Sequence, residues 1–110
     1  MTGIFEQRDR AYEAMWAHDE ETRFRILALR NEFLGHWAAD QLGLSDSSAD
    51  IYVQAMIRTG MLGRGKEPVF DKMRGDFATH GISCSEHALR RKMEELFHLA
   101  SQELTRREAS

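Results

Sequence analysis

The sequence has very little cysteine and proline, and it has no long apolar run. Its single cysteine, Cys84, excludes an internal disulfide and a zinc site built from cysteines alone. One proline in 110 residues argues against a β-sandwich or barrel, which needs many turns. No stretch of about 18 apolar residues is present, and the N-terminus lacks the pattern of a secretory signal. We therefore expect a cytoplasmic protein without a transmembrane helix.

An excess of positive charge is also missing. The chain carries 15 Lys and Arg residues against 18 Asp and Glu residues, which gives a formal net charge of −3. This balance argues against a broad nucleic-acid-binding surface. Apolar residues make up 42% of the chain and charged residues 30%. These values are typical of one globular domain with a large solvated helix surface.

Apolar residues recur at helical spacing in four segments, which glycine- or serine-rich breaks separate. The predicted helices span residues 20–43, 46–60, 67–80 and 84–105, and residues 106–110 are expected to fray. Gly43 and Gly81 are predicted helix stops, with Ile82 making the apolar contact that follows the second stop. Ser83 is predicted to cap the last helix, with Glu86 completing a capping box. The sequence therefore predicts an all-α fold, a compact four-helix bundle over residues 20–105.

The first predicted helix carries an apolar stripe that we expect to be buried. Its positions are mostly three, four or seven residues apart: Phe24, Leu27, Ala28, Leu34, Ala38 and Leu42. Asp19 is the predicted N-cap of this helix, and the two glutamates that follow it complement the helix dipole.

An amphipathic segment, residues 3–18, precedes the predicted bundle. Its apolar positions share one helical face: Ile4, Phe5, Ala11, Tyr12, Met15 and Trp16. Its charged positions lie off that face: Glu6, Asp9, Arg10 and Glu13. An isolated helix of this length is only marginally stable in water. The segment therefore extends the first helix and packs internally, docks on its own bundle, or folds on binding a partner, and the pattern leaves these alternatives open.

Two motifs resemble binding sites but are better explained as structure. Residues 60–67 read G-x-x-x-x-G-K-E, whereas a phosphate-binding loop needs Ser or Thr after the lysine. A weak contact with ADP or ATP at the start of the third helix stays open. Residues 70–92 resemble a helix-turn-helix, but His87 and Arg90 would fall at inward positions of its second helix. DNA binding by this segment is therefore kept only as an alternative.

Candidate catalytic and metal-binding groups are sparse. His80, Cys84 and His87 could approach one another across a turn, but no fourth ligand is obvious. No nucleophile with a base and no pair of carboxylates stands out. We therefore predict that the protein is not an enzyme and has no metal site.

Several segments, taken together, resemble one known family. They are Phe5-Glu6-x-Arg8, Ala11-Tyr12-Glu13-Ala14, Trp16-Ala17-His18-Asp19-Glu20-Glu21, Arg30-Asn31, Leu34-Gly35, Trp37-Ala38-Ala39-x-x-Leu42-Gly43-Leu44, Val69-Phe70-x-Lys72-x-Arg74-x-Asp76-Phe77 and Arg90-Arg91-Lys92-Met93-x-Glu95-Leu96. In this order, and over nearly the whole chain, they are similar to the zeta subunits that inhibit the F-type ATP synthase of alphaproteobacteria.

The resemblance implies a four-helix bundle with a mobile inhibitory arm, residues 1–19. In the family, the arm inserts at an alpha/beta interface of the catalytic head, near the rotating gamma shaft. There it blocks ATP hydrolysis and leaves synthesis largely free. The implied partner-binding residues are Phe5, Glu6, Arg8, Arg10, Ala11, Tyr12, Met15 and Trp16. The resemblance also implies a monomer when free, peripheral to the inner membrane when bound.

Two departures from the family pattern keep one alternative open. Met15 stands where the family would have lysine, and the linker over residues 60–66 is glycine-rich rather than acidic. The alternative is a nucleotide-binding regulatory helical bundle with little inhibitory activity.

Overall fold

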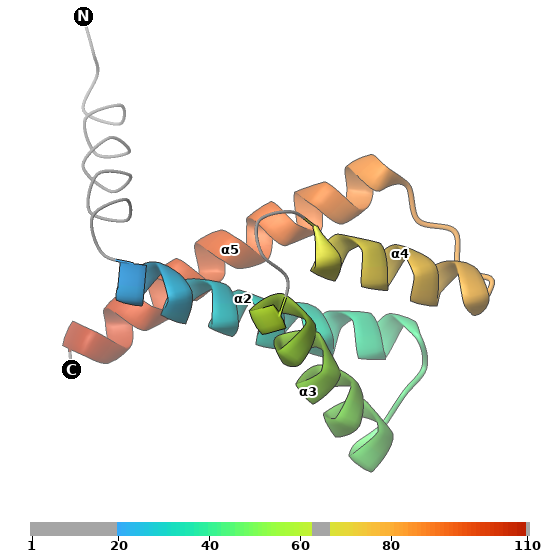
Figure 1. Ribbon diagram of the computed structural model, residues 1–110, viewed down its shortest axis with the longest axis horizontal. Helices are drawn as coiled ribbons and strands as arrows, with labels where there is room; N and C mark the ends of the chain where they lie inside the picture. The colour runs from blue at the N-terminus through green and yellow to red at the C-terminus, as the bar shows by residue number, and fades with distance from the viewer. Residues whose placement is uncertain (1–19, 63–66, 110) are drawn as a thin grey trace, which may run out of the picture.

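The computed structural model describes residues 20–62 and 67–109. They form four helices, α2 (Glu20–Gln41), α3 (Asp46–Leu62), α4 (Pro68–Thr79) and α5 (Glu86–Ala109), and no strand (Figure 1). The predicted all-α fold with four helices is confirmed for this part of the chain. The predicted arm and its junction with the bundle at Asp19 lie outside the described residues.

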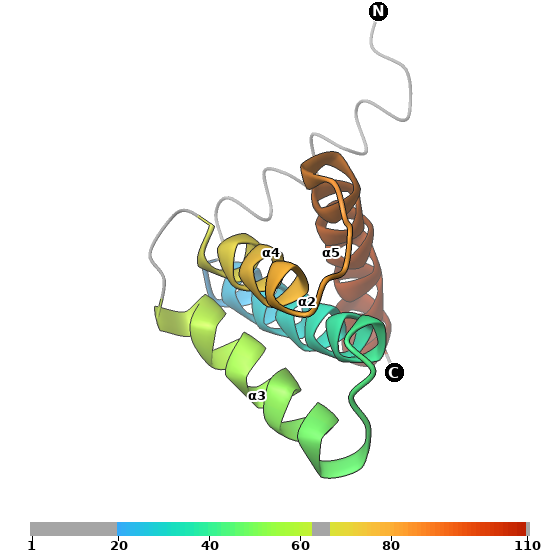
Figure 2. The same cartoon turned by 90° about the vertical axis from the view of Figure 1, so that its right-hand side faces the viewer.

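Helix α2 occupies the centre of the bundle. It packs most extensively against α3 and α5, and α4 lies against α3 and α5. Viewed along α2, the other three helices surround it (Figure 2). The shorter α4 covers the end where α2 finishes and α5 begins, whereas the last turns of α5 lie beside the start of α2 (Figure 1).

Two apolar clusters form the core. The first is centred on four fully buried side chains, one from each helix: Leu34, Met56, Met73 and Leu89. The second joins α2 to the far half of α5 and consists of Ile26, Leu29, Ala100 and Leu104, flanked by Phe33 and Phe97. The first cluster therefore holds all four helices together, while the second belongs to α2 and α5 alone.

The start of α2 differs from the predicted apolar stripe. Phe24 was predicted to be buried but is 53% exposed, and Leu27 and Ala28 are only half-buried. The buried residues in these turns are Ile26 and Leu29, which face α5. The prediction for Phe24 was wrong because it assumed a neighbour along the whole length of that side of α2.

Phe24 lacks a neighbour because of the way in which α3 packs on α2. A Cβ atom added at Gly35 would lie 2.9 Å from the Cα atom of Val53, and one added at Gly60 would collide with the side-chain amide of Asn31. The two helices therefore run antiparallel in close contact, with Gly60 opposite Asn31. Because α3 ends two residues after Gly60, the turns of α2 before Asn31 have no α3 beside them.

Glycines end α2 and α4 as the sequence predicts. Gly43 and Gly81 have φ values of 73° and 69°, a left-handed conformation that glycine adopts without a steric penalty. After Gly81, the backbone N–H of Ile82 donates to the carbonyl oxygen of Phe77 at 2.8 Å. The side chain of Ile82 packs against the first core cluster, as expected for this kind of helix stop.

The cap of α5 differs from the prediction by two residues. The helix begins at Glu86, and the Oγ atom of Ser85 accepts a hydrogen bond from the backbone N–H of Ala88 at 3.0 Å. Ser85, rather than Ser83, is therefore the N-cap. The capping box was wrongly placed because Ser83 has the glutamate that the pattern requires three residues later, whereas Ser85 has Ala88 there; the helix nevertheless begins two residues further on, at Glu86.

The segment expected to fray is helical as far as Ala109. Arg106 and Arg107 pair with the carboxylate of Glu103 at 2.6 and 3.0 Å, three and four residues along the helix. These hydrogen bonds, that from Arg106 first, lower the pKa of Glu103 from 4.5 to about 2. Residues three and four apart are neighbours on the surface of a helix, so the pairs favour a helical end.

Candidate functional site

The eight predicted partner-binding residues all lie in the arm. Phe5, Glu6, Arg8, Arg10, Ala11, Tyr12, Met15 and Trp16 fall outside the described residues. The structure therefore describes the bundle without the arm. The described candidates for a functional site are the polar and charged groups on the bundle surface.

The arm joins the bundle at a well-anchored helix start. The chain enters α2 at Glu20, and the second core cluster lies one to two turns further on. Arg25 also pairs with Glu108 in the last turn of α5, at 3.3 Å. Both side chains are half-exposed, so this ion pair contributes little stability. The start of α2 is thus held to α5 mainly by apolar contacts.

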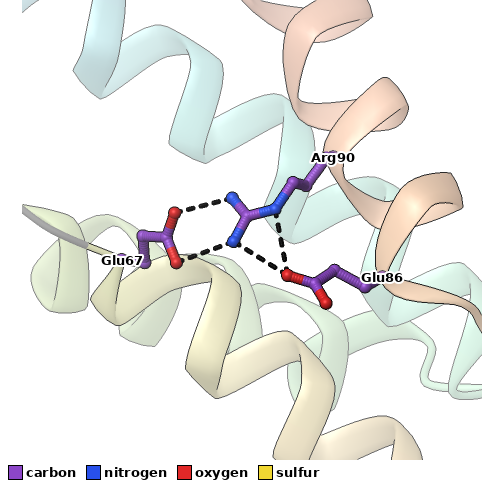
Figure 3. Close-up of polar contacts among 3 residues, drawn as sticks. All are labelled: Glu67, Glu86 and Arg90. Atoms are coloured by element: carbon purple, nitrogen blue, oxygen red, sulfur yellow. Dashed lines mark hydrogen bonds and ion pairs between the residues drawn. The ribbon is translucent and has the colours of Figure 1, made fainter.

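A charged network joins the starts of α4 and α5 (Figure 3). The guanidinium of Arg90 donates to both carboxylate oxygens of Glu67, at 2.6 and 2.8 Å. It also donates to one oxygen of Glu86, at 3.1 and 3.3 Å, and stacks 4.2 Å from the ring centre of Phe70. The hydrogen bonds to Glu67 raise the pKa of Arg90 above its usual value. Arg90 therefore joins α5 to the start of α4 through Glu67, while Glu86 contacts the same guanidinium from within α5.

This network and its surroundings count against DNA binding by residues 70–92. Arg90 and His87 are exposed rather than inward, and Arg90 is already paired with two acids. The Nζ atom of Lys92 lies 2.7 Å from Glu95 and 5.5 Å from the ring centre of Trp37. Two of the three consecutive basic side chains are thus neutralised by carboxylates, which is unfavourable for contacts with phosphates.

The start of α4 is equally unsuited to phosphate. Glu67 occupies the N-cap position of this helix, and Pro68 follows it without a backbone N–H. A carboxylate at a helix N-terminus occupies the place where an anion would be favoured. Residues 63–66, the other part of the expected nucleotide contact, lie outside the described part of the chain. The described part gives this contact no support.

The histidines and the cysteine near the α4–α5 turn lie apart from one another. Among the residues that the structure describes, no three His, Cys, Asp or Glu side chains are placed to hold one metal ion. The Nδ1 atom of His80 lies 2.8 Å from the carbonyl oxygen of Asp76. Cys84 is half-buried and packs against the first core cluster. His80 and Cys84 therefore make contacts within the fold, and His87 is exposed.

A second polar group, which sequence reasoning missed, joins α3 to α4. The hydroxyl of Tyr52 donates to Asp76 at 2.8 Å, and Lys72 pairs with the same carboxylate at 3.1 Å. Burial, followed by the hydrogen bond to Asp76, raises the pKa of Tyr52 above its usual value. The spacing of Lys72 and Asp76 could have indicated their pair. The contact with Tyr52, 24 residues away, had no local signal.

The polar networks on the described surface join helices to one another. They do not identify the protein family, which comes from comparison with known families. The family described as ATPase inhibitor subunit zeta matches residues 1–103. The chain belongs to this family. The match covers both the described bundle and the predicted arm, and it confirms the resemblance found from the sequence motifs. No curated protein matches the chain.

As a zeta-family member, the chain belongs among inhibitor subunits, which regulate rather than catalyse. Within residues 20–62 and 67–109, no helix combines the length and apolar character needed to cross a membrane.

Proposed function

We propose that this protein inhibits ATP hydrolysis by the F-type ATP synthase by inserting residues 3–18 into the alpha/beta/gamma interface of the catalytic head. The observation that carries the proposal is the family match over residues 1–103, which includes the whole arm. The bundle adds support, because both of its core clusters are built from residues 26–104. The described helices thus supply a core of their own, which supports a role for the apolar face of the arm outside the bundle.

The proposed mechanism is steric. A helix that folds into an interface acts as a wedge between parts that must move against each other during rotation. Ordering the arm costs conformational entropy, and burial of its apolar face offsets that cost at about 25 cal/mol per Å². Large aromatic side chains dominate such interfaces. Tyr12 and Trp16 are therefore the expected anchors.

The bundle contributes by holding the arm at the synthase. Any contact that the bundle makes with the catalytic head raises the effective concentration of the arm there. Because α2 is anchored to α5 by the second core cluster, the arm leaves the bundle from a fixed point. In this proposal, inhibition depends on the arm and retention at the synthase depends on the bundle.

The proposal is tested with an ATP hydrolysis assay on the cognate synthase. Tyr12→Ala and Trp16→Ala should each weaken inhibition by a factor of about 10–30, the effect of losing an anchor worth about 2 kcal/mol. Glu13→Ala, a charged neighbour in the same segment, serves as the matched control and should change inhibition less than about threefold. Circular dichroism should show the same helix content in all three variants.

Removal of residues 1–18 provides the decisive comparison. The truncated chain should keep its bundle and lose inhibition. Full inhibition by that chain would rule out the arm as the inhibitory element. If the full-length chain fails to inhibit but binds ADP, with amide shifts at residues 63–66, the nucleotide-binding alternative takes its place.

A further inference from the structure

Arg30 is a half-buried cation in the middle of α2. The Nε and Nη2 atoms of its guanidinium donate to the side-chain oxygen of Asn31, at 3.1 and 2.9 Å. Burial lowers the pKa of Arg30 from its usual value, and no carboxylate in residues 20–62 and 67–109 offsets this shift. Arginine nevertheless stays charged in proteins. The guanidinium is therefore a partly desolvated charge whose partner in the described chain is a neutral amide, which is an unfavourable arrangement.

Asn31 holds this charge at the place where three helices meet. The Asn31 side chain is almost fully buried and lies against Gly60, near the end of α3. A Cβ atom added at Gly60 would also lie 3.4 Å from the side chain of Val69, in the first turn of α4. These contacts leave the Asn31 amide little freedom to turn away. Arg30 is thus positioned at the junction of α2, α3 and α4.

One edge of the Arg30 guanidinium is unused within the described chain. A guanidinium has five N–H groups in a fixed plane, and Asn31 accepts one from Nε and one from Nη2. The edge formed by Nη1 and Nη2 keeps one N–H group on each nitrogen that points in the same direction. That edge matches the two oxygens of a carboxylate, which it binds through two parallel hydrogen bonds.

We infer, on the basis of the proposed function, that Arg30 docks the bundle on the synthase by pairing with a carboxylate side chain of the catalytic head. The segment between α3 and α4 does not supply this carboxylate. Residues 63–66 read Gly-Arg-Gly-Lys, and Glu67 pairs through both of its oxygens with Arg90. A carboxylate from the partner completes the pair instead.

Two features favour a protein partner over a nucleotide. Met61 and Leu62, the next two residues after Gly60, are 59% and 79% exposed. Exposed apolar side chains next to an arginine are typical of a protein contact. A single guanidinium also matches the single charge of a carboxylate, whereas Glu67 at the N-cap of α4 disfavours the several charges of nucleotide phosphates.

The pairing has opposite effects on stability and on binding. In the free protein the half-buried charge lowers stability, because its lost hydration is not replaced by an ion pair. At the synthase the carboxylate supplies that interaction, so the same residue strengthens the complex. A neutral side chain at position 30 should therefore weaken binding without weakening the fold. A residue that only supported the fold would lose both together.

The first experiment measures binding of the full-length chain to the isolated catalytic head of the cognate synthase, and thermal unfolding of the same variants. Arg30→Gln should raise the dissociation constant by a factor of about 10–30 and melt at or above the temperature of the parent. Arg74→Gln replaces an exposed arginine on α4 with the same change in net charge, and should alter the constant less than about threefold. Equal constants for the two variants would overturn the inference. A melting temperature of Arg30→Gln more than about 4 °C below the parent would overturn it too, because Arg30 would then have its partner within the chain.

The second experiment identifies the group that Arg30 contacts. The Arg30→Lys variant, saturated with the head, is treated with a carbodiimide, which joins an amine to a neighbouring carboxylate through an amide bond with loss of water. Mass spectrometry should find position 30 linked to an aspartate or glutamate of the head. Arg74→Lys, treated in the same way, should give no link from position 74. The inference fails if position 30 of the bound variant gives no link.

Two further outcomes separate this inference from its alternatives. Millimolar inorganic phosphate or ATP should leave the NMR signal of the Arg30 Nε–H group in the free chain unchanged, and a shift would assign the site to a phosphate and refute the docking. If the chain binds the head without inhibiting hydrolysis, the proposed function fails while the Arg30 comparison still decides the docking. If the chain inhibits and Arg30→Gln binds as tightly as the parent, only the docking fails. A chain that does not bind the head refutes both.

Discussion

A single methyl group at Gly35 tests the closest contact in the bundle. Gly35 lies where α2 and α3 cross, and a Cβ atom there would sit 2.9 Å from the Cα atom of Val53 and 3.4 Å from the Cβ atom of Met56. Because the nearest atom belongs to the backbone, no side-chain rotation can relieve the clash. The Gly35→Ala substitution must therefore push α3 away from α2, and the fully buried Met56 moves with it.

The expected magnitude follows from two opposing effects. Replacing glycine by alanine inside a helix stabilises it by about 1 kcal/mol. Overpacking a well-packed contact costs about 1–3 kcal/mol. Gly75, inside α4, has no atom within 4 Å of an added Cβ, so Gly75→Ala should show the stabilisation alone. We expect Gly35→Ala to be less stable than Gly75→Ala by about 1–3 kcal/mol.

Thermal unfolding of the two full-length variants, followed by circular dichroism, measures this difference. One kcal/mol corresponds to about 4–8 °C in Tm for a domain of this size. Gly75→Ala should melt above the parent protein, and Gly35→Ala should melt at least about 4 °C below Gly75→Ala. Equal melting temperatures would show that α3 can move aside freely and would refute the close packing inferred at this crossing.

Two further predictions concern α5. Ser85→Ala should destabilise the protein by about 1 kcal/mol in urea unfolding, while Ser83→Ala should be nearly neutral; the reverse order would restore the cap predicted from the sequence. Because the pKa of Glu103 is lowered from 4.5 to about 2, its pairs stabilise the fold fully above pH 4.5, and this contribution is lost as the pH falls towards 2. Glu103→Gln should remove that part of the pH dependence of unfolding, and an unchanged pH profile would contradict the pairing.

The sequence predicted helix ends best where a single residue type determines the backbone conformation. The helix stops at Gly43 and Gly81 depend on a backbone conformation that one residue type prefers, so they could be predicted from the chain alone. The choice between Ser83 and Ser85 depends on where the first turn of α5 begins, and the capping-box pattern favoured Ser83 although Ser85 caps the helix. Local patterns thus predict that a boundary exists more reliably than they predict its exact residue.

Contacts between helices could not be predicted from the sequence. Arg90 read as part of a basic run, and only the fold brings Glu67, 23 residues earlier, within 2.6 Å of it. Phe24 belonged to a regular apolar stripe, and its exposure follows from where α3 stops rather than from α2 itself. The site residues in the arm were proposed from family resemblance alone, since an amphipathic pattern does not identify its partner.

The unequal lengths of the helices divide the described bundle into two parts. Helix α4 has 12 residues and α5 has 24, so the far half of α5 extends beyond α4. That half packs on the start of α2 through the second core cluster and forms a two-helix stem next to the four-helix core. The polar ties between α3 and α4 and between α4 and α5 both lie on the four-helix part of the bundle. The start of α2 is therefore held by the stem, separately from the polar ties that join α4 to its neighbours.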